Sequence, residues 1–278
     1  MYKNNNVKFS VLMSVYKKEK PNNLRECFES LLLQTVKADE WVMVKDGPLT
    51  RELDDVIEEY QIQYPNLIKC VELSKNRGLG LALREGILHC SNELIARMDT
   101  DDICVYNRFE KQLIEFEKNP TIHICGTYIE EFEDETKQVV SVRKVPLHQE
   151  EIKKYQIYRS SFNHVSVMFK KTAVLHAGNY QDALFVEDDL LWVNMLNTGS
   201  VGVNIAECLV RVRVGKELIK RRGGYSYYKQ YKSGRKKIRD TGFINERQYC
   251  ISLLIQLMVC LVPNSIRRKI FINLLRKE

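Results

Sequence analysis

The sequence of 278 residues predicts an α/β fold, a mostly parallel sheet flanked by helices, with a mainly helical and basic C-terminal extension. Short apolar runs alternate with amphipathic stretches of about a dozen residues, a pattern typical of parallel strands joined by crossover helices. Polar and acidic residues follow the first, second and fourth runs. Because ligands bind beyond the carboxyl ends of such strands, a binding site is expected at one sheet edge.

The first half of the chain alternates regularly. Strands are expected over residues 8–15, 40–45, 68–73 and 94–98. Helices are expected over residues 22–34, 50–64 and 79–89. Asn22 or Asn23 is expected to cap the first helix, and Thr50 the second.

The second half is less regular. Helices are expected over residues 107–119, 148–158, 171–177 and 187–197. Residues 122–132 and 138–145 are expected to form an antiparallel pair, with a short strand over 165–170 and no element predicted for 201–214. The predicted domains are a nucleotide-binding catalytic domain over 1–218 and a helical extension over 219–278.

Composition indicates an ordinary globular protein, with 44% hydrophobic and 28% charged residues. The eight cysteines are scattered, without a C-x-x-C pair or zinc spacing, which favours the reduced thiols of a cytoplasmic protein. Residues 1–7 are polar and lead straight into a strand, so no signal peptide is expected.

Positive charge is concentrated near the C-terminus. Between Arg211 and Arg247, 13 Lys and Arg face three acids, a local charge of +10 against +7 for the whole chain. This surplus indicates an anionic partner. A nucleic-acid-binding protein is one alternative, but no recognised nucleic-acid motif accompanies the basic tail, so no nucleic-acid partner is expected.

The apolar run over residues 251–262 raises the question of a membrane. It has 12 residues, whereas a bilayer span needs roughly 20, so it is not expected to cross. Basic residues follow it, and two interpretations stay open: a helix lying along an anionic membrane surface, or a core helix packed on the catalytic domain.

The run Leu94–Asp102 (LIARMDTDD) places three carboxylates within four residues at a predicted strand end. Their mutual repulsion is costly unless a cation binds there. Oxygen ligands favour Mg²⁺ or Mn²⁺, which leave coordination positions open for phosphate oxygens. The alternative is a solvated acidic turn that caps the next helix.

The ordered motifs SVYKKE, VKDGP, NRGLGLAL, ARMDTDD and VEDDLLW resemble glycosyltransferase family 2, the inverting nucleotide-sugar transferases of GT-A fold, over about residues 9–213. The segments KRRGG and LVPNSIRRKI resemble bacterial members that build capsule, exopolysaccharide or O-antigen. The resemblance implies transfer of Gal or Glc from a UDP-hexose, plausibly in β-1,3 linkage, to a lipid-diphosphate-linked sugar. It also implies a cytoplasmic enzyme, peripheral at the inner face of a bacterial membrane.

The resemblance assigns the donor side of the site. Asp46 would accept the N3–H of uracil, and Ser14 and Tyr16 would line the nucleotide pocket. Arg77 would reach the base or the diphosphate, while Gly78 would let the backbone pass closely. Taken alone, Asp46-Gly-Pro could instead be a plain turn.

The carboxylates receive roles in the same way. Asp99 would contact the ribose and, with Asp101, hold Mn²⁺ or Mg²⁺, and Asp102 would steady the acceptor or donor sugar. Asp188 would act as the general base, with Glu187 as the alternative. Acids at a helix start could instead merely complement the helix dipole.

Three further residues are expected on the acceptor side. His164 would touch metal or substrate, although a lone histidine before an apolar strand can be structural. Arg221 and Arg222, beside two glycines, would clamp a diphosphate or else form a solvated charge run.

Other enzyme classes fit less well. A haloacid-dehalogenase-like phosphatase would need Thr or Val where this chain has Ile103, and its later acidic motif is missing. A Rossmann dinucleotide enzyme would place its glycine loop after the first strand rather than the third. A sugar nucleotidyltransferase would need a glycine-rich N-terminal loop. The sequence therefore predicts a metal-dependent inverting glycosyltransferase.

Overall fold

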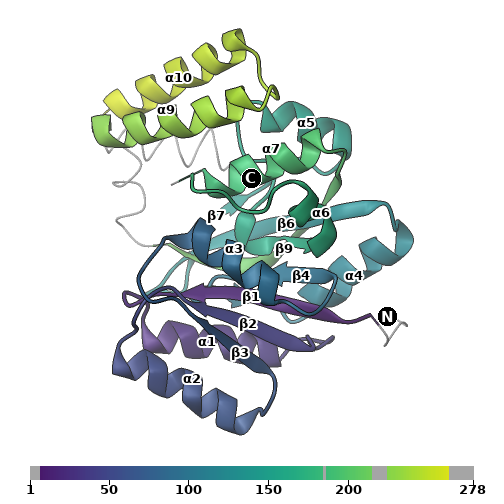
Figure 1. The fold of residues 1–278 in the computed structure, drawn as a ribbon, viewed down its shortest axis with the longest axis vertical. Coiled ribbons are helices and arrows are strands. Elements are labelled where there is room, and N and C mark those ends of the chain that lie inside the picture. The colour runs from purple at the N-terminus through teal and green to yellow at the C-terminus, as the bar shows by residue number, and fades with distance from the viewer. Residues whose placement is uncertain (1–6, 184–185, 215–223, 263–278) are drawn as a thin grey trace.

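The computed structural model describes residues 7–183, 186–214 and 224–262. In these residues one sheet of nine strands has the order β3-β2-β1-β4-β8-β6-β9-β5, with β7 paired to β6 (Figure 1). The parallel half contains β1 (Phe9–Val15), β2 (Glu40–Lys45), β3 (Ile68–Glu72) and β4 (Leu94–Arg97). Its crossover helices are α1 (Pro21–Leu32), α2 (Arg51–Gln63) and α3 (Leu79–His89).

The other half of the sheet is mixed. It contains β5 (Ile103–Cys104), β6 (Ile122–Glu133), β7 (Val139–Arg143), β8 (Met168–Lys170) and β9 (Val201–Val214). Strand β8 runs antiparallel to both β4 and β6, whereas β9 runs parallel to β6. Its helices are α4 (Arg108–Lys118), α5 (Gln149–Gln156), α6 (Lys171–His176) and α7 (Glu187–Asn197), with a 3₁₀ turn at His164–Ser166.

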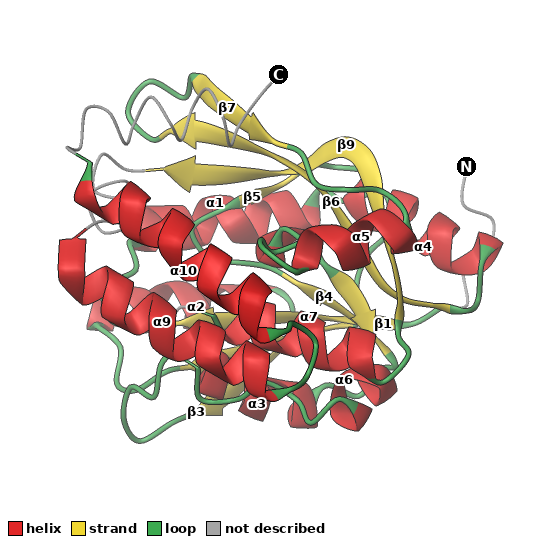
Figure 2. Cartoon of the chain, turned by 90° about the horizontal axis from the view of Figure 1, so that it is seen from above, coloured by secondary structure: helices red, strands yellow, loops and turns green. Residues whose placement is uncertain are grey.

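Strand alternation produces two separate cores, because successive side chains point to opposite faces of the sheet. Val11 and Met13 of β1 pack with α1, α2 and α4 on one face. Leu12, between them, packs with α3, α6 and α7 on the other. The result is a three-layer arrangement with helices on both faces of the sheet (Figure 2).

Two local expectations were wrong. The first helix begins at Pro21, so Asn22 and Asn23 lie inside it and Lys20 is the N-cap; proline suits the first helical position because its fixed φ is already helical and its missing N–H needs no partner there. Residues 201–214, for which no element was predicted, form β9. The predicted antiparallel pair of β6 and β7 is confirmed.

The described part of the C-terminal extension is helical, with α9 (Gly224–Asp240) and α10 (Glu246–Leu261) side by side at one end of the molecule (Figure 1). The two helices share a small apolar core with α7, made of Ala183, Val186, Leu190, Val193, Ile238, Ile244 and Tyr249. The buried Arg235 of α9 joins them to the end of α5, because its Nη2 donates to the Ile157 carbonyl at 2.5 Å. Among the described residues, no helix is both long enough and apolar enough to cross a membrane.

Candidate active site

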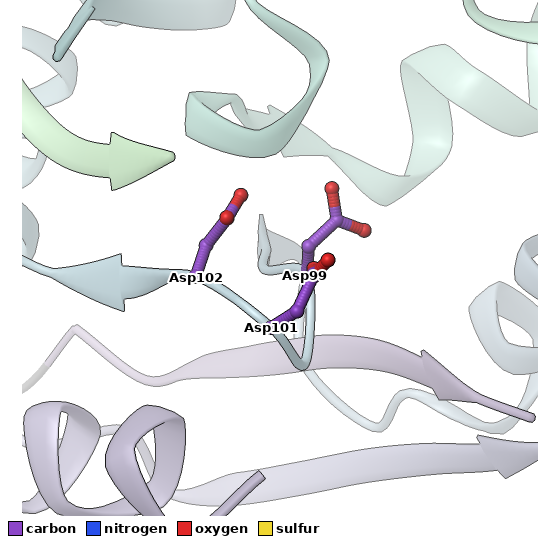
Figure 3. Close-up of side chains that lie close together, drawn as sticks. All are labelled: Asp99, Asp101 and Asp102. Carbon is purple, nitrogen blue, oxygen red and sulfur yellow. The ribbon is translucent and has the colours of Figure 1, made fainter. Parts of the chain in front are cut away.

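The acidic loop, residues 98–102, follows β4 at the carboxyl end of the parallel strands. Ligand oxygens of Asp99, Asp101 and Asp102 lie within 4.8 Å of one another, and Figure 3 shows the three side chains around this loop. The loop is fastened to β1 on one side, because the Met98 N–H donates to the Leu12 carbonyl at 3.0 Å. The three predicted carboxylates are thus brought together.

The electrostatics of this cluster are unfavourable without a cation. Burial, together with repulsion from Asp99 and Glu19, raises the pKa of Asp101 to about 7. Burial and the neighbouring carboxylates also raise the pKa of Asp102 well above its usual range. A set of crowded oxygen donors fits a hard divalent ion such as Mg²⁺ or Mn²⁺, which would favour the ionised forms.

Arg97, the last residue of β4, supplies a positive charge beneath the loop. Its Nη2 pairs with Asp99 Oδ1, and its side chain is fully buried. Its Nε and Nη1 atoms have no hydrogen-bond partner among the described residues. The sequence does contain a signal for Arg97, because a charged residue stands in the otherwise apolar run LIAR. Sequence reasoning missed this signal.

Arg213 of β9 holds the other side of the loop. Its backbone N–H donates to Asp102 Oδ1 at 2.8 Å, and its Nε donates to the Asp101 carbonyl at 2.8 Å. Its guanidinium also pairs with Glu26 of α1, at 2.7 Å, and with Asp134 after β6. Sequence reasoning missed this residue together with its strand, although VRVRV alternates as a half-buried strand does.

The nucleotide side is built around Asp46 at the end of β2. Its two carboxylate oxygens accept hydrogen bonds from the backbone N–H groups of Arg77, at 2.7 Å, and Gly78, at 3.0 Å. Gly78 is required for its φ of 86° rather than for a close approach, because nothing lies within 4 Å of where its Cβ would be. Tyr16 is exposed and Ser14 half-buried at the end of β1.

The predicted base lies at the first turn of α7. Burial, with repulsion from Asp189 and Glu187, raises the pKa of Asp188 to about 7. This turn contacts the start of α3, because a Cβ on Gly80 would lie 2.8 Å from the Glu187 Cβ. The second glycine of NRGLG therefore makes room for Glu187, and the helix bearing Asp188 is held beside the loop that carries Arg77.

His164 lies between the acidic loop and α7. Its Nε2 hydrogen-bonds the Tyr180 hydroxyl at 2.6 Å, and its ring centroid lies 5.9 Å from that of Trp192. Burial and the Arg97 cation hold the pKa of His164 well below its usual value, so the ring is neutral. The Tyr180 hydroxyl is close enough for Arg97 and Asp188 both to act on it electrostatically.

The predicted residues therefore gather along one edge of the sheet, in three neighbouring groups: the nucleotide side, the acidic loop and the start of α7. Arg221 and Arg222 lie outside the described residues. None of the eight cysteines, all of which are described, forms a disulfide.

The chain resembles known proteins in both its sequence and its fold. The model of the glycosyl transferase family 2 matches residues 10–182. The chain is 39% identical over 258 residues to the amylovoran biosynthesis glycosyltransferase AmsE of Erwinia amylovora, covering 92% of this chain and 94% of that protein.

A second relative is the UDP-Gal:alpha-D-GlcNAc-diphosphoundecaprenol beta-1,3-galactosyltransferase of Escherichia coli, 38% identical over 270 residues, with 97% of each chain covered. Among solved structures, S. aureus TarS 1-349 in complex with UDP-GlcNAc matches with a TM-score of 0.63 at 16% identity, over 90% of this chain and 72% of that chain. The chain therefore belongs to glycosyltransferase family 2 and is a glycosyltransferase of GT-A fold.

Proposed function

We propose that this protein is a metal-dependent, inverting hexosyltransferase that uses a UDP-hexose, Gal or Glc, in the synthesis of a bacterial surface polysaccharide. Its acceptor is a sugar linked to a lipid diphosphate, and the new linkage is β-1,3. The E. coli relative, whose name gives this donor, acceptor and linkage, supports the assignment along nearly the whole chain.

The observation that carries the proposal is the pairing of two acidic groups at one sheet edge. The acidic loop gathers three carboxylates within 4.8 Å, and α7 begins nearby with Asp188. One group suits a metal-bound diphosphate and the other a proton acceptor. A metal-dependent inverting transfer needs both.

Asp101 and Asp99 would hold Mn²⁺ or Mg²⁺. The bound ion would supply positive charge for the diphosphate of the leaving UDP. Asp46, tied to the Arg77 loop, supports a uracil-binding role at the same edge, and Tyr16 is exposed beside it. Asp102, fixed by the Arg213 backbone, would orient a sugar hydroxyl.

Asp188 accepts the proton during the reaction. The acceptor hydroxyl oxygen forms a bond to the anomeric carbon while the bond from that carbon to the UDP oxygen breaks. Attack from the face opposite UDP inverts the configuration, so an α-linked donor gives a β-linkage. The carboxylate of Asp188 takes the hydroxyl proton, and UDP leaves with the bonding electrons.

The acceptor of this proposal is attached to a membrane, and α10 presents a surface suited to one. Leu254, Ile255, Met258 and Leu261 form an exposed stripe on this helix, 49% to 74% exposed. Exposed lysines lie on the adjacent α9, at 229, 232 and 236. Apolar side chains beside cations favour the surface of an anionic bilayer, and we place the enzyme there as a peripheral protein.

A panel of UDP-sugars with Mn²⁺ or Mg²⁺ tests the proposal. The wild type should hydrolyse one UDP-hexose slowly and transfer it to a lipid-diphosphate-linked amino sugar. D101N should abolish transfer and weaken UDP binding only when metal is present, whereas D55N, at an exposed acid on α2, should behave as wild type. Release of phosphate from phosphomonoesters, or UDP binding indifferent to metal, would contradict it.

A further inference from the structure

Two arginines near Asp188 belong neither to the acidic loop nor to the nucleotide side. Arg143 is the last residue of β7, and Arg159 lies just beyond α5. Arg143 Nη2 donates to the Ser160 carbonyl at 3.2 Å, which places its guanidinium against the residue that follows Arg159. Two elements thus deliver two cations to one place.

The same place adjoins the start of α7. The last residue of α5, Gln156, donates from Nε2 to Asp189 Oδ1 at 3.0 Å, so the end of α5 is joined to the residue after the base. Asp188 and Asp189 both act electrostatically on Arg143. The arginines therefore lie beside the base, whereas Arg97 and Arg213 serve the acidic loop.

Neither arginine is held in a close ion pair within the described residues. In the described part of the chain, Arg143 and Arg159 form no ion pair with a carboxylate; Arg143 bonds a carbonyl, and Arg159 lies with its guanidinium carbon 5.5 Å from the Tyr155 ring centre. Burial and repulsion from Arg159 lower the pKa of Arg143. Neighbouring cations that form no close ion pair repel each other, and paired guanidinium forks fit the oxygens of phosphate.

We propose that Arg143 and Arg159 bind the diphosphate of the lipid-linked acceptor, one sugar ring away from Asp188. The inference rests on the proposed function. The donor diphosphate belongs at the carboxylates, where a metal would hold it. A second diphosphate, carried by the sugar whose hydroxyl faces the base, needs cations on the side of α7, where these two arginines lie.

The C-terminal helices indicate where the lipid chain of the acceptor would lie. Arg235 of α9 bonds the Ile157 carbonyl, two residues before Arg159. Through this contact α9 and α10 are joined to the turn that carries Arg159. The exposed apolar stripe lies on α10, one of these two helices. A diphosphate at Arg143 and Arg159 would thus have its lipid chain beside the surface that we assign to the membrane.

Transfer kinetics with two acceptors test the site. One is an N-acetylhexosamine diphosphate on a short water-soluble lipid, and the other is the same sugar as an alkyl glycoside without phosphate. R159M and R143M should each raise the KM for the diphosphate acceptor about tenfold or more, because a charge-assisted contact is lost. R143K should fall between, since it keeps the charge without the fork. Hydrolysis of the UDP-hexose should be unchanged in R159M.

The matched controls are K144M and K154M, which remove one positive charge from the exposed lysines near each arginine and should leave both acceptors unaffected. For the phosphate-free glycoside, R159M should equal wild type, and R143M should keep the wild-type KM while lowering kcat, because Arg143 favours the ionised form of Asp188. An unchanged KM for the diphosphate acceptor, or an equal rise for both acceptors, would overturn the inference.

Thermal unfolding checks that each variant is folded. If R143M does not fold, the result with R159M decides whether the inference holds. If the wild type transfers to neither acceptor, the proposed function itself fails.

Discussion

The carboxyl group of Asp188 is held near the balance point between its two protonation states. Its burial at the start of α7, next to Glu187 and Asp189, favours the neutral acid, whereas Arg143 favours the anion. A general base works best when its pKa lies near the working pH, because it is then ionised and still able to hold a proton. This setting favours the proposed role of Asp188 as a general base over that of an acid that only complements the helix dipole.

Replacing Asp188 by Asn should lower kcat by about 100-fold or more, because the acceptor proton then has no acceptor group. Affinity for UDP should stay near that of wild type, since the donor contacts lie at the acidic loop. Isothermal titration with UDP and Mn²⁺, beside a transfer assay, separates the two effects. E187Q serves as the comparison; a larger loss in E187Q than in D188N would move the base to Glu187.

The pH dependence follows from the same group. With a pKa of about 7 in place of the ordinary 3.8, Asp188 is protonated below neutrality, so kcat/KM should fall about tenfold for each pH unit below 7. The profile should be recorded at saturating Mn²⁺, because protons also compete with metal at Asp101. A plateau extending down to pH 5 would show that Asp188 does not limit the reaction.

At the scale of elements, β9 decides the shape of the acidic loop. Running parallel to β6, it carries Arg213 next to its last residue, and Arg213 contacts Asp101 and Asp102 and two acids on other elements. The hydrogen bond from Arg213 lowers the pKa of Glu26, because it favours the ionised carboxylate. We therefore assign Arg213 a positioning role, in which it would act on the substrate through the loop.

Replacing Arg213 by Met should raise the Mn²⁺ concentration for half-maximal activity several-fold, because the loop loses the contact at the Asp101 carbonyl. It should also lower the free energy of unfolding by about 1–3 kcal/mol, since two acids lose their partner. R211M is the control. Arg211 lies on the same strand as Arg213, with its guanidinium carbon 4.9 Å from the centre of the Phe132 ring, and it pairs with Glu130 rather than with Glu26 and Asp134. Equal metal dependence in R213M and R211M would contradict the positioning role.

At the scale of the molecule, the fold separates the tasks of the enzyme along the chain. The parallel half carries the proposed nucleotide side, the mixed half shapes the acidic loop, and α7 connects the proposed base to the C-terminal helices through a shared apolar core. Arg235 fixes this attachment by bonding the turn after α5. The surface proposed for the membrane is thus rigidly connected to the acceptor side.

Changing Leu254 and Met258 together to Ser should reduce binding to vesicles that contain an anionic lipid, because both side chains are more than half exposed on the α10 stripe. Thermal stability should be unaffected, because surface substitutions usually change the free energy of unfolding very little. Raising the salt concentration should weaken binding of the wild type, since the lysines of α9 contribute. L88S, at an exposed leucine of α3, is the control, and equal vesicle binding of both variants would exclude this surface.

Local patterns determined the parallel half of this protein. Alternating apolar runs gave four strands and their helices to within a few residues, and the end of the fourth run placed Asp99, Asp101 and Asp102 together. The acids of α7 begin their helix as predicted. These features depend on residues near one another in sequence, and periodicity and composition report such relations directly.

Tertiary structure alone decided which distant residues meet. Arg213 is 111 residues from Asp102 in the sequence. The two residues meet because β9 lies between β6 and β5 in the sheet and pairs with both strands. Glu187 fills the space next to Gly80, and no local sequence pattern predicts this contact. Sheet register and helix packing set such contacts through the burial of whole faces, so the sequence supplied the groups of the site and the packing supplied their arrangement.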